Sequence, residues 1–241
     1  MMALIRTLIF YVYYSVVTGV VGILAGIGYW FLPAKRVAPL VCCWSVLVVH
    51  GARILCGIRY VRHGNLPEPG KQYVIMSKHQ SAWETFYLQM VCGRISTILK
   101  KELLRIPGFG WGLRVLQPVA IDRSNPLKAL KQVKEQGMAR IRSGRSLLVF
   151  PEGTRIAVGE SGKYARSGAE IAVTTGVEVI PVAHNAGYCW INKRFIKKPG
   201  LITVVFGEPI KTEGKTSKQL TEEVKQWIDS QQAKIEPPPE Q

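Results

Sequence analysis

An uncharged segment near the N-terminus restricts what this chain can fold into more than any other feature. Residues 7–34 contain no charged side chain and are rich in Leu, Ile, Val, Gly and aromatic residues. As a helix rising about 1.5 Å per residue, the segment is about 42 Å long, which exceeds the roughly 30 Å hydrocarbon core of a bilayer. It is too long for the apolar part of a cleaved signal peptide, and no small-residue cleavage site follows it. We therefore expect a helix in contact with a membrane.

A second apolar segment, residues 37–58, follows the short connection 32–36. The pair is compatible with two membrane spans or with a hairpin immersed in one leaflet. Basic residues do not decide between these alternatives, because Lys35 and Arg36 lie in the connection while Arg53 lies in the second segment. Small residues of the first segment either let the two helices approach closely or reflect how common glycine is in membrane helices; they are Ser15, Gly19, Gly22 and Gly26.

The charge of the chain predicts an anionic partner. The formal net charge is +16, and no acidic residue precedes Glu68. Such an excess suits phospholipid headgroups, a phosphorylated substrate, an acidic carrier protein or nucleic acid. A purely cationic segment beside apolar helices is typical of a membrane-facing surface.

Cysteines and histidines do not indicate a metal site. The five cysteines show neither paired spacing nor a C-x-x-C motif, which favours free thiols in a reducing compartment. The four histidines lack the H-x-x-x-H or Cys/His spacing of metal ligands, so we predict that no metal is bound.

Beyond residue 58, short apolar runs alternate with longer amphipathic ones, which predicts an α/β domain with a mixed sheet flanked by helices. We expect strands at 58–61, 73–76, 96–99, 118–121, 146–150, 177–182 and 201–206, and helices at 83–91, 125–141, 167–175 and 217–231. The predicted organisation is a two-helix hydrophobic membrane anchor at 1–58, the α/β domain at 59–232 and a disordered tail at 233–241.

A histidine and a carboxylate, His79 and Glu84, lie where the strand expected at 73–76 gives way to a helix. Five residues on one helix span about 140° around its axis, so we place His79 before the helix and Glu84 in its first turn. There the imidazole can accept a proton from a hydroxyl, while the carboxylate fixes its tautomer and stabilises the imidazolium. The spacing alone also suits a surface or capping histidine.

A second polar turn, residues 151–155, follows the strand expected at 146–150. Gly153 permits close backbone approach, Thr154 offers a hydroxyl, and Arg155 offers a planar fork that matches a phosphate. A turn with a solvated charge pair is the competing interpretation, and the segment lacks the P-loop pattern. Lys100 and Arg123 also follow apolar strands, and basic side chains at several strand ends can converge on one anion at the carboxyl edge of a sheet.

In this order and at these intervals, the segments resemble the glycerolipid acyltransferase family, particularly the 1-acyl-sn-glycerol-3-phosphate acyltransferases. Segments similar to the four family motifs lie at residues 79–84, 120–123, 150–155 and 179–182. The resemblance covers residues 59–208, and the Glu-Gly-Thr-Arg block in register with the histidine is its most specific part. Glu84 stands where the family's H-x-x-x-x-D motif has aspartate, so its carboxylate must be set back or rotated to reach the imidazole.

The resemblance implies an O-acyltransferase that moves a fatty acyl group from an acyl thioester to the sn-2 hydroxyl of 1-acyl-glycerol-3-phosphate, giving phosphatidic acid. It assigns the general base to His79 and its orientation to Glu84, with direct attack and no acyl-enzyme. It also assigns the acyl thioester site to Pro181 and phosphate binding to Lys100, Arg123, Glu152, Gly153, Thr154 and Arg155.

The implied partners are lysophosphatidic acid, acyl-CoA or acyl carrier protein as the donor, and the phospholipid bilayer, with no cofactor and no nucleic acid. The implied location is a bacterial inner membrane, with the catalytic domain facing the cytoplasm. Another acceptor, such as a lyso-ornithine lipid, stays open. So does a non-enzymatic basic module that binds membrane or nucleic acid, although the interleaved aromatic residues of a stacking platform are missing. A nucleophilic Ser77 or Ser81 is disfavoured because the G-x-S-x-G motif is absent.

Overall fold

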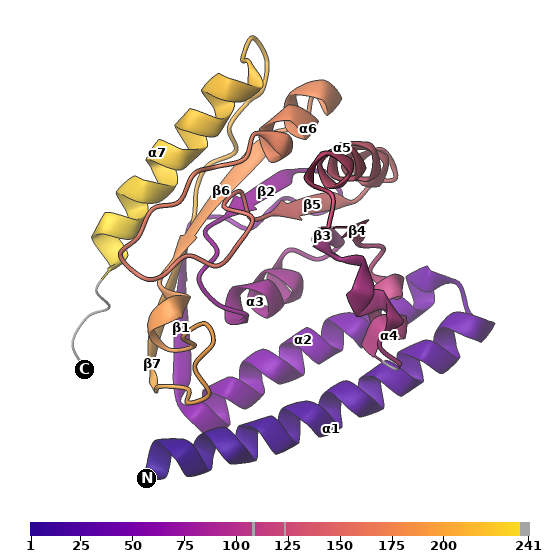
Figure 1. Cartoon of the computed structure of the whole chain (residues 1–241), viewed down its shortest axis with the longest axis vertical. Coiled ribbons are helices and arrows are strands. Elements are labelled where there is room, and N and C mark those ends of the chain that lie inside the picture. The colour runs from indigo at the N-terminus through magenta and orange to yellow at the C-terminus, as the bar shows by residue number, and fades with distance from the viewer. Residues whose placement is uncertain (108, 123, 237–241) are drawn as a thin grey trace.

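Two long helices precede the α/β body of this protein. The computed structural model describes residues 1–107, 109–122 and 124–236. Helix α1 (Met2–Phe31) is joined by a tight turn to α2 (Ala34–Cys56), and both are long and apolar enough to cross a membrane. In Figure 1 they lie together along one edge of the molecule, beside α3 (Trp83–Val91) and α4 (Phe109–Val115).

A single seven-stranded sheet forms the centre of the body. Its spatial order is β1-β7-β6-β2-β5-β3-β4. Only the β6–β7 pair is antiparallel, so β1 and β7 run opposite to the other strands and the sheet is mixed, as predicted. Every expected strand is present within two residues of its expected bounds; the strands are β1 (Ile58–His63), β2 (Val74–Ser77), β3 (Ile95–Lys100), β4 (Val119–Ile121), β5 (Ser146–Val149), β6 (Val179–His184) and β7 (Gly200–Phe206).

Three further helices cover the other face of the sheet: α5 (Pro126–Arg142), α6 (Ser167–Thr175) and α7 (Ser217–Ile235) (Figure 1). Asn125 is the N-cap of helix α5, because its side chain accepts a hydrogen bond from the Lys128 N–H at 3.0 Å. The expectation that α7 ends at residue 231 is wrong, since the helix continues to Ile235. The tail predicted to be disordered from residue 233 is therefore helical at its start, and residues 237–241 lie outside the described residues.

Helix α4 was not expected from the sequence. Its residues follow a short 3-10 turn (Lys101–Arg105) and include Gly110 and Gly112, and glycine disfavours a helix interior by about 1 kcal/mol relative to alanine. A second 3-10 turn (Ala186–Tyr188) links β6 to the loop before β7. Tertiary packing against α1 therefore overrides the low helix propensity of α4.

Alternation along β2 divides the core between the two faces of the sheet. Ile75 packs in a cluster with Leu148 and the side chains of α1, α2 and α3, including Phe10 and Trp44. Val74 and Met76 point to the opposite face, where α5, α6 and α7 complete a second cluster. The N-terminal helices therefore share one core with the sheet. The predicted division of the chain at residue 58 stays a prediction.

The small residues of α1 make room for α4. An ideal Cβ on Gly26 would lie 2.5 Å from the Cε3 atom of Trp111, and one on Gly112 would lie 3.9 Å from the Gly22 Cα atom. Gly19 has open space at its Cβ position, and no contact there requires a glycine. Close approach at Gly22 and Gly26 thus serves α4, which lines the cavity described next.

Candidate active site

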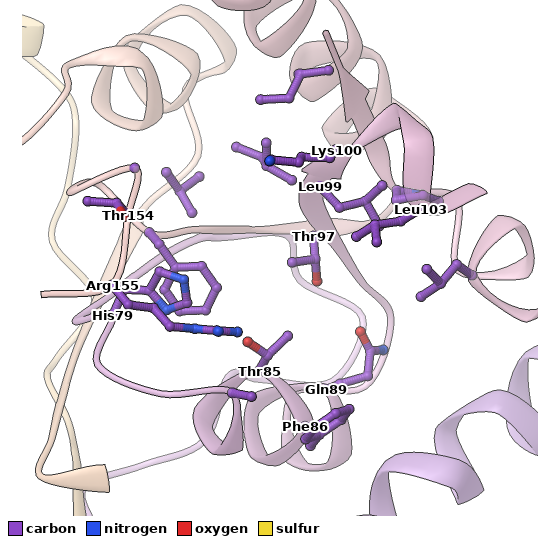
Figure 2. A pocket seen from close by; sticks show the side chains of 18 of the residues that line it. His79, Thr85, Phe86, Gln89, Thr97, Leu99, Lys100, Leu103, Thr154 and Arg155 are labelled. Carbon is purple, nitrogen blue, oxygen red and sulfur yellow. The ribbon is translucent and has the colours of Figure 1, made fainter. Parts of the chain in front are cut away.

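A cavity of about 650 Å³ opens at the carboxyl ends of the parallel strands β2, β3 and β5. His79 enters from the segment after β2, Lys100 from the end of β3, and Arg155 from the turn after β5 (Figure 2). Parallel strands bring the loops at their carboxyl ends to one edge, which is why residues distant in sequence meet here. The sheet topology therefore creates the site.

The predicted His79–Glu84 contact is present. His79 Nδ1 lies 2.9 Å from Glu84 Oε1, and the same oxygen accepts the backbone N–H groups of Gln80 at 3.0 Å and Ser81 at 2.8 Å. A carboxylate accepts only, so Nδ1 carries the proton that it donates to Glu84. Nε2 of the neutral ring then has a free lone pair.

Glu84 reaches the imidazole from the first turn of helix α3. Ser81 Oγ accepts the Trp83 N–H at 2.9 Å while Glu84 accepts the Ser81 N–H, a reciprocal arrangement similar to a capping box. Helix α3 starts at Trp83, so Glu84 lies in its first turn as expected, where the helix dipole favours negative charge. The extra methylene therefore lets one oxygen satisfy the turn and the histidine together.

A stacking contact with Phe150 also holds the imidazole ring of His79. The ring stacks on Phe150 with centroids 3.9 Å apart and planes inclined by 16°. The side chain is 14% exposed, so it reaches the cavity while most of its surface is covered. A ring held by one stacking contact and one hydrogen bond has little rotational freedom.

The Glu84 carboxyl has a lowered pKa although it is buried. Burial alone raises the pKa, but His184, the hydrogen bond from His79 and the Ser81 N–H outweigh it. At neutral pH the group is therefore an anion able to stabilise a proton on His79.

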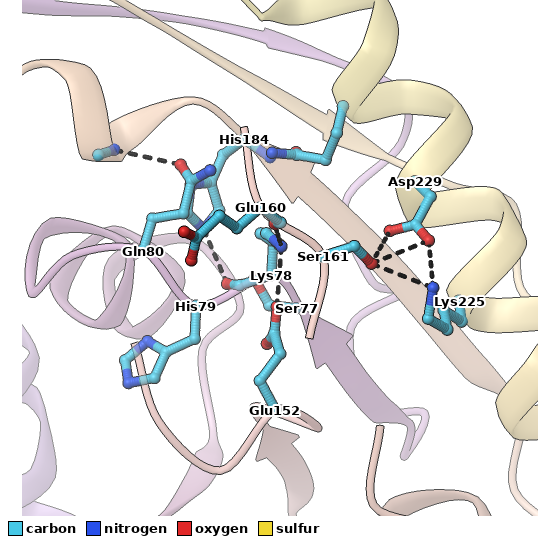
Figure 3. Close-up of polar contacts among 12 residues, drawn as sticks. Ser77, Lys78, His79, Gln80, Glu152, Glu160, Ser161, His184, Lys225 and Asp229 are labelled. Carbon is cyan, nitrogen blue, oxygen red and sulfur yellow. Dashed lines mark hydrogen bonds and ion pairs between the residues drawn. The ribbon is translucent and has the colours of Figure 1, made fainter. Parts of the chain in front are cut away.

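A second histidine, His184, holds the backbone beside His79 (Figure 3). Its Nδ1 accepts the Ala186 N–H at 3.2 Å, so Nε2 is the donor to the Lys78 carbonyl at 2.8 Å. Burial lowers the pKa of His184, which agrees with a neutral ring that has a partner at each nitrogen. His184 thus supports the residue immediately before His79 without reaching the cavity.

A buried ion pair joins the His79 segment to the turn after β5. Lys78 Nζ lies 3.2 Å from Glu152 Oε1 and donates to the Glu160 carbonyl at 2.7 Å; the side chains of Lys78 and Glu152 are 2% and 0% exposed. Burial raises the pKa of Glu152, and Lys78 opposes that rise. Figure 3 shows Glu152 directed towards Lys78, on the side away from the His79 ring.

The C-terminal end of α7 also reaches this segment. Glu236 Oε1 accepts from Gln80 Nε2 at 2.5 Å, and Glu236 Oε2 accepts the Gly159 N–H at 3.1 Å. Gln80 in turn accepts the Gly187 N–H at 3.2 Å through its Oε1. Two distant parts of the chain, at Gly187 and Glu236, therefore fix the residue after His79.

Some of the residues that the resemblance assigned to phosphate and thioester binding line the cavity, and others do not. Lys100, Gly153, Thr154 and Arg155 all line the cavity. Glu152 does not line it, because its carboxylate is turned to Lys78. Pro181 is buried in the middle of β6, next to Met76 of β2, and does not line the cavity either. Arg123 lies outside the described residues.

Several lining residues were missed by the sequence analysis. Thr85 and Gln89 lie one turn apart on α3, a spacing that the predicted helix contains but that no motif marks. Asn192 and Lys193 come from the loop before β7, and no sequence signal identifies them. Most of the remaining wall is apolar; its members include Trp44, Phe86, Phe109, Leu103, Leu113 and Leu116. Among the described residues no group of His, Cys, Asp or Glu has the arrangement of a metal site.

An oriented histidine beside cationic side chains and a long apolar wall suits group transfer on an amphiphilic, anionic substrate. The sequence profile of the acyltransferase family matches residues 57–185, and the chain belongs to this family. The predicted enzyme class is thereby confirmed.

Individual relatives have names that are more specific than the name of the family. The chain is 42% identical to a 1-acyl-sn-glycerol-3-phosphate acyltransferase of Pseudomonas aeruginosa, over 97% of this chain and 92% of the relative. It is 29% identical to the human 1-acyl-sn-glycerol-3-phosphate acyltransferase alpha, over 68% of this chain and 59% of the relative. The crystal structure of the 1-acyl-sn-glycerophosphate acyltransferase of Thermotoga maritima is similar with a TM-score of 0.82 at 24% identity, covering 99% of this chain and 98% of that one. This similarity confirms the predicted fold class.

Proposed function

We propose that this protein is a membrane-bound acyltransferase that moves a fatty acyl group from an acyl thioester to the sn-2 hydroxyl of 1-acyl-sn-glycerol-3-phosphate, giving phosphatidic acid. The observation that carries the proposal is the His79–Glu84 hydrogen bond of 2.9 Å at the wall of a cavity that Arg155 also lines. The names of the relatives support the choice of acceptor.

His79 acts as the general base. Its Nδ1–H is donated to Glu84, so Nε2 accepts the proton of the sn-2 hydroxyl as the oxygen attacks the thioester carbonyl carbon. Collapse of the tetrahedral intermediate breaks the C–S bond, and the thiolate leaves with the proton from the imidazolium. The products are the ester and the free thiol. General-base assistance contributes about 10²–10⁴-fold, and the fixed ring supplies orientation.

The two substrate ends are recognised by different walls of the cavity. Arg155 and Lys100 attract the phosphate of the acceptor, and the Thr154 hydroxyl can donate to it. Apolar side chains of α2, α3 and α4 accept fatty acyl chain. The donor carrier is acyl-CoA or acyl carrier protein, since the positive charge of the chain suits either anionic carrier.

The N-terminal helices support a hairpin immersed in one leaflet. Helix α1 contacts the body near both ends: Phe10 packs edge-on against Trp190 at 5.3 Å, and Gly26 lies against Trp111. A helix lying along the body in this way does not leave it to cross a bilayer. Its outer face is a row of exposed apolar side chains: Leu4, Ile5, Leu8, Ile9, Val12, Val16, Val20, Ile23, Leu24, Ile27 and Trp30. We place this face in the cytoplasmic leaflet of a bacterial inner membrane, and the free cysteines suit that compartment.

The test uses purified full-length protein in mixed micelles with labelled lysophosphatidic acid and each donor, followed by identification of the product lipid. We expect phosphatidic acid from the wild type. We expect the His79→Ala variant to lose at least about 100-fold in kcat, while in a separate assay it still sediments with phospholipid vesicles. Wild-type turnover by His79→Ala would refute the mechanism. Activity with a lyso-ornithine lipid but not with lysophosphatidic acid would reassign the acceptor.

A further inference from the structure

The loop between Cys189 and Pro199 forms part of the cavity wall but lies outside the four motifs. Asn192 and Lys193 of this loop line the cavity together with His79 and Arg155. Arg155 Nη1 donates to Asn192 Oδ1 at 3.3 Å, so the loop directly meets the turn after β5.

The cavity wall carries an uncompensated positive charge. Lys100, Arg155 and Lys193 line it, and none of the described lining residues is acidic. The nearest carboxylate of the turn, that of Glu152, is buried against Lys78. Within the described part of the chain, none of the three lining cations forms an ion pair. By contrast Lys101, next to Lys100, is paired with Asp122. A wall with three free cations and no carboxylate favours a multiply charged anion.

The loop is held rigidly by a buried lysine. Lys197 Nζ donates to the Arg194 carbonyl at 2.9 Å and the Phe195 carbonyl at 2.8 Å, and it lies 5.1 Å from the ring centroids of both Tyr11 and Trp190. The Lys197 residue is only 2% exposed. A buried cation that satisfies two loop carbonyls and faces two aromatic rings fixes the chain around it.

The same loop is fastened to α1. The Lys197 N–H donates to Thr7 Oγ1 at 3.0 Å, and Phe195 stacks on Tyr11 with ring centroids 4.9 Å apart. Asn192 and Lys193 are therefore supported by the helix that we place at the membrane surface. A preorganised loop of this kind binds a ligand without a large ordering cost.

Lys193 has a left-handed backbone conformation, with φ of 59°. This conformation is unfavourable for a residue with a Cβ atom relative to the right-handed region. Glycine would relieve that cost, yet the chain has a long cationic side chain at the rim of the cavity. Strain at such a position is a feature of ligand-contacting residues.

We propose that Asn192 and Lys193 complete a phosphate site whose other members are Arg155 and Lys100. The inference rests on the proposed function, because it gives the anionic end of a substrate a second set of contacts. Lys193 supplies charge, and Asn192 orients the Arg155 guanidinium through its amide oxygen. The phosphate comes either from the lysolipid acceptor or from the phosphorylated carrier of the donor.

Three variants that each lower the net charge by one test the site. Lys193→Met removes the cation and keeps a Cβ at the strained position, and Asn192→Asp places a carboxylate beside Arg155. Lys198→Met is the matched control, because Lys198 is an exposed lysine of the same loop that does not line the cavity. KM and kcat are measured for lysophosphatidic acid and for acyl-CoA at low and high salt.

We expect Lys193→Met to raise KM for one phosphorylated substrate about tenfold at low salt, with kcat changed less than threefold, because one charge-assisted contact is lost. For Asn192→Asp we expect KM for the same substrate to rise by at least as much. Both effects shrink at high salt, and Lys198→Met leaves both constants unchanged. A rise for lysophosphatidic acid assigns the phosphate to the acceptor, and a rise for acyl-CoA assigns it to the donor. Unchanged KM for both substrates in Lys193→Met would overturn the site.

A binding measurement separates this inference from the proposed reaction. The inactive His79→Ala protein is titrated with lysophosphatidic acid, with its phosphate-free monoacylglycerol analogue, and with CoA. We expect Lys193→Met on this background to weaken binding of a phosphorylated ligand about tenfold and to leave monoacylglycerol binding unchanged. If wild-type protein turns over no lysophosphatidic acid but this difference persists, only the proposed function fails. Equal binding with and without Lys193 overturns the site whatever the turnover.

Discussion

Removing the cation of the buried Lys78–Glu152 pair should destabilise the protein strongly. In Lys78→Met the apolar stem is nearly preserved, but the Glu152 carboxylate, whose side chain is 0% exposed, loses the ammonium 3.2 Å away. The Glu160 carbonyl loses its donor as well. Breaking a buried ion pair at one partner typically costs about 3–5 kcal/mol. At about 2–4 °C per kcal/mol for a chain of this size, the expected fall in Tm is roughly 6–20 °C.

The loss of stability in Lys78→Met relative to wild type should increase as pH rises. Burial already raises the pKa of Glu152 above its ordinary value of 4.5, and Lys78 opposes the rise, so removing Lys78 raises this pKa further. A carboxyl whose pKa is higher in the folded state binds a proton more readily there, so the folded state loses stability as pH rises from the unfolded-state pKa to the folded-state pKa. The deficit of Lys78→Met relative to wild type should therefore be smaller at about pH 5 than at about pH 8.

The assay is unfolding in detergent micelles followed by circular dichroism, for wild type, Lys78→Met, Glu152→Gln and the double variant. We expect the double variant to be less destabilised than the sum of the single variants by about 1–3 kcal/mol, because both charges are then absent. We also expect kcat/KM to fall in Lys78→Met, since the pair joins the His79 segment to the Arg155 turn. Additive single effects, or a deficit that grows towards low pH, would refute the reasoning.

Two further predictions concern single residues. Glu84→Gln keeps an oxygen for His79 and for the Gln80 and Ser81 N–H groups but removes the charge that stabilises the imidazolium. A charge-assisted hydrogen bond exceeds a neutral one by about 1–2 kcal/mol, so kcat should fall about 5–30-fold, and an unchanged kcat in a steady-state assay would show that the charge is unused. Gly64→Ala should lower the free energy of unfolding by roughly 2–4 kcal/mol, because Gly64 has φ of 80° and an added Cβ would lie 2.1 Å from the Phe206 carbonyl oxygen. Gly70→Ala, at φ of 87° with nothing within 4 Å, isolates the backbone effect and should cost only about 1 kcal/mol in the same denaturation experiment.

The sheet could be predicted from the sequence because its strands are short apolar runs with polar ends, and this pattern depends on local burial. Helix α4 could not be predicted, since Gly110 and Gly112 oppose a helix locally. Its formation is explained by packing against Gly22 and Gly26 of α1. The end of α7 was missed for a similar reason. Glu236 is ordered by Gln80 and Gly159, which are distant in sequence.

The contact between His79 and Glu84 was predictable because the two residues lie close together in the chain. His79 and Glu84 meet across one helix start, and their contact follows from that spacing. The Lys78–Glu152 pair was missed because a lysine beside a motif is usually solvated, and its burial depends on how two loops pack. Asn192 reaches Arg155 only through the fold, and Pro181 matches a motif yet lies within the sheet, so contacts of this kind require the structure.

The pairing of β1 with β7 has a consequence for how the protein is made. Ile58 is paired with Gly200. Of the seven strands, β1 leaves the ribosome first and β7 leaves last, so β1 has no partner in the sheet until β7 is synthesised. By then the two apolar helices have been outside the ribosome during synthesis of most of the domain. Until β7 emerges, β1 is an open edge that directly follows the two apolar helices, and such edges pair readily with other chains. Synthesis that stops before residue 200 therefore leaves a fragment that contains both apolar helices and whose first strand has no neighbour in the sheet.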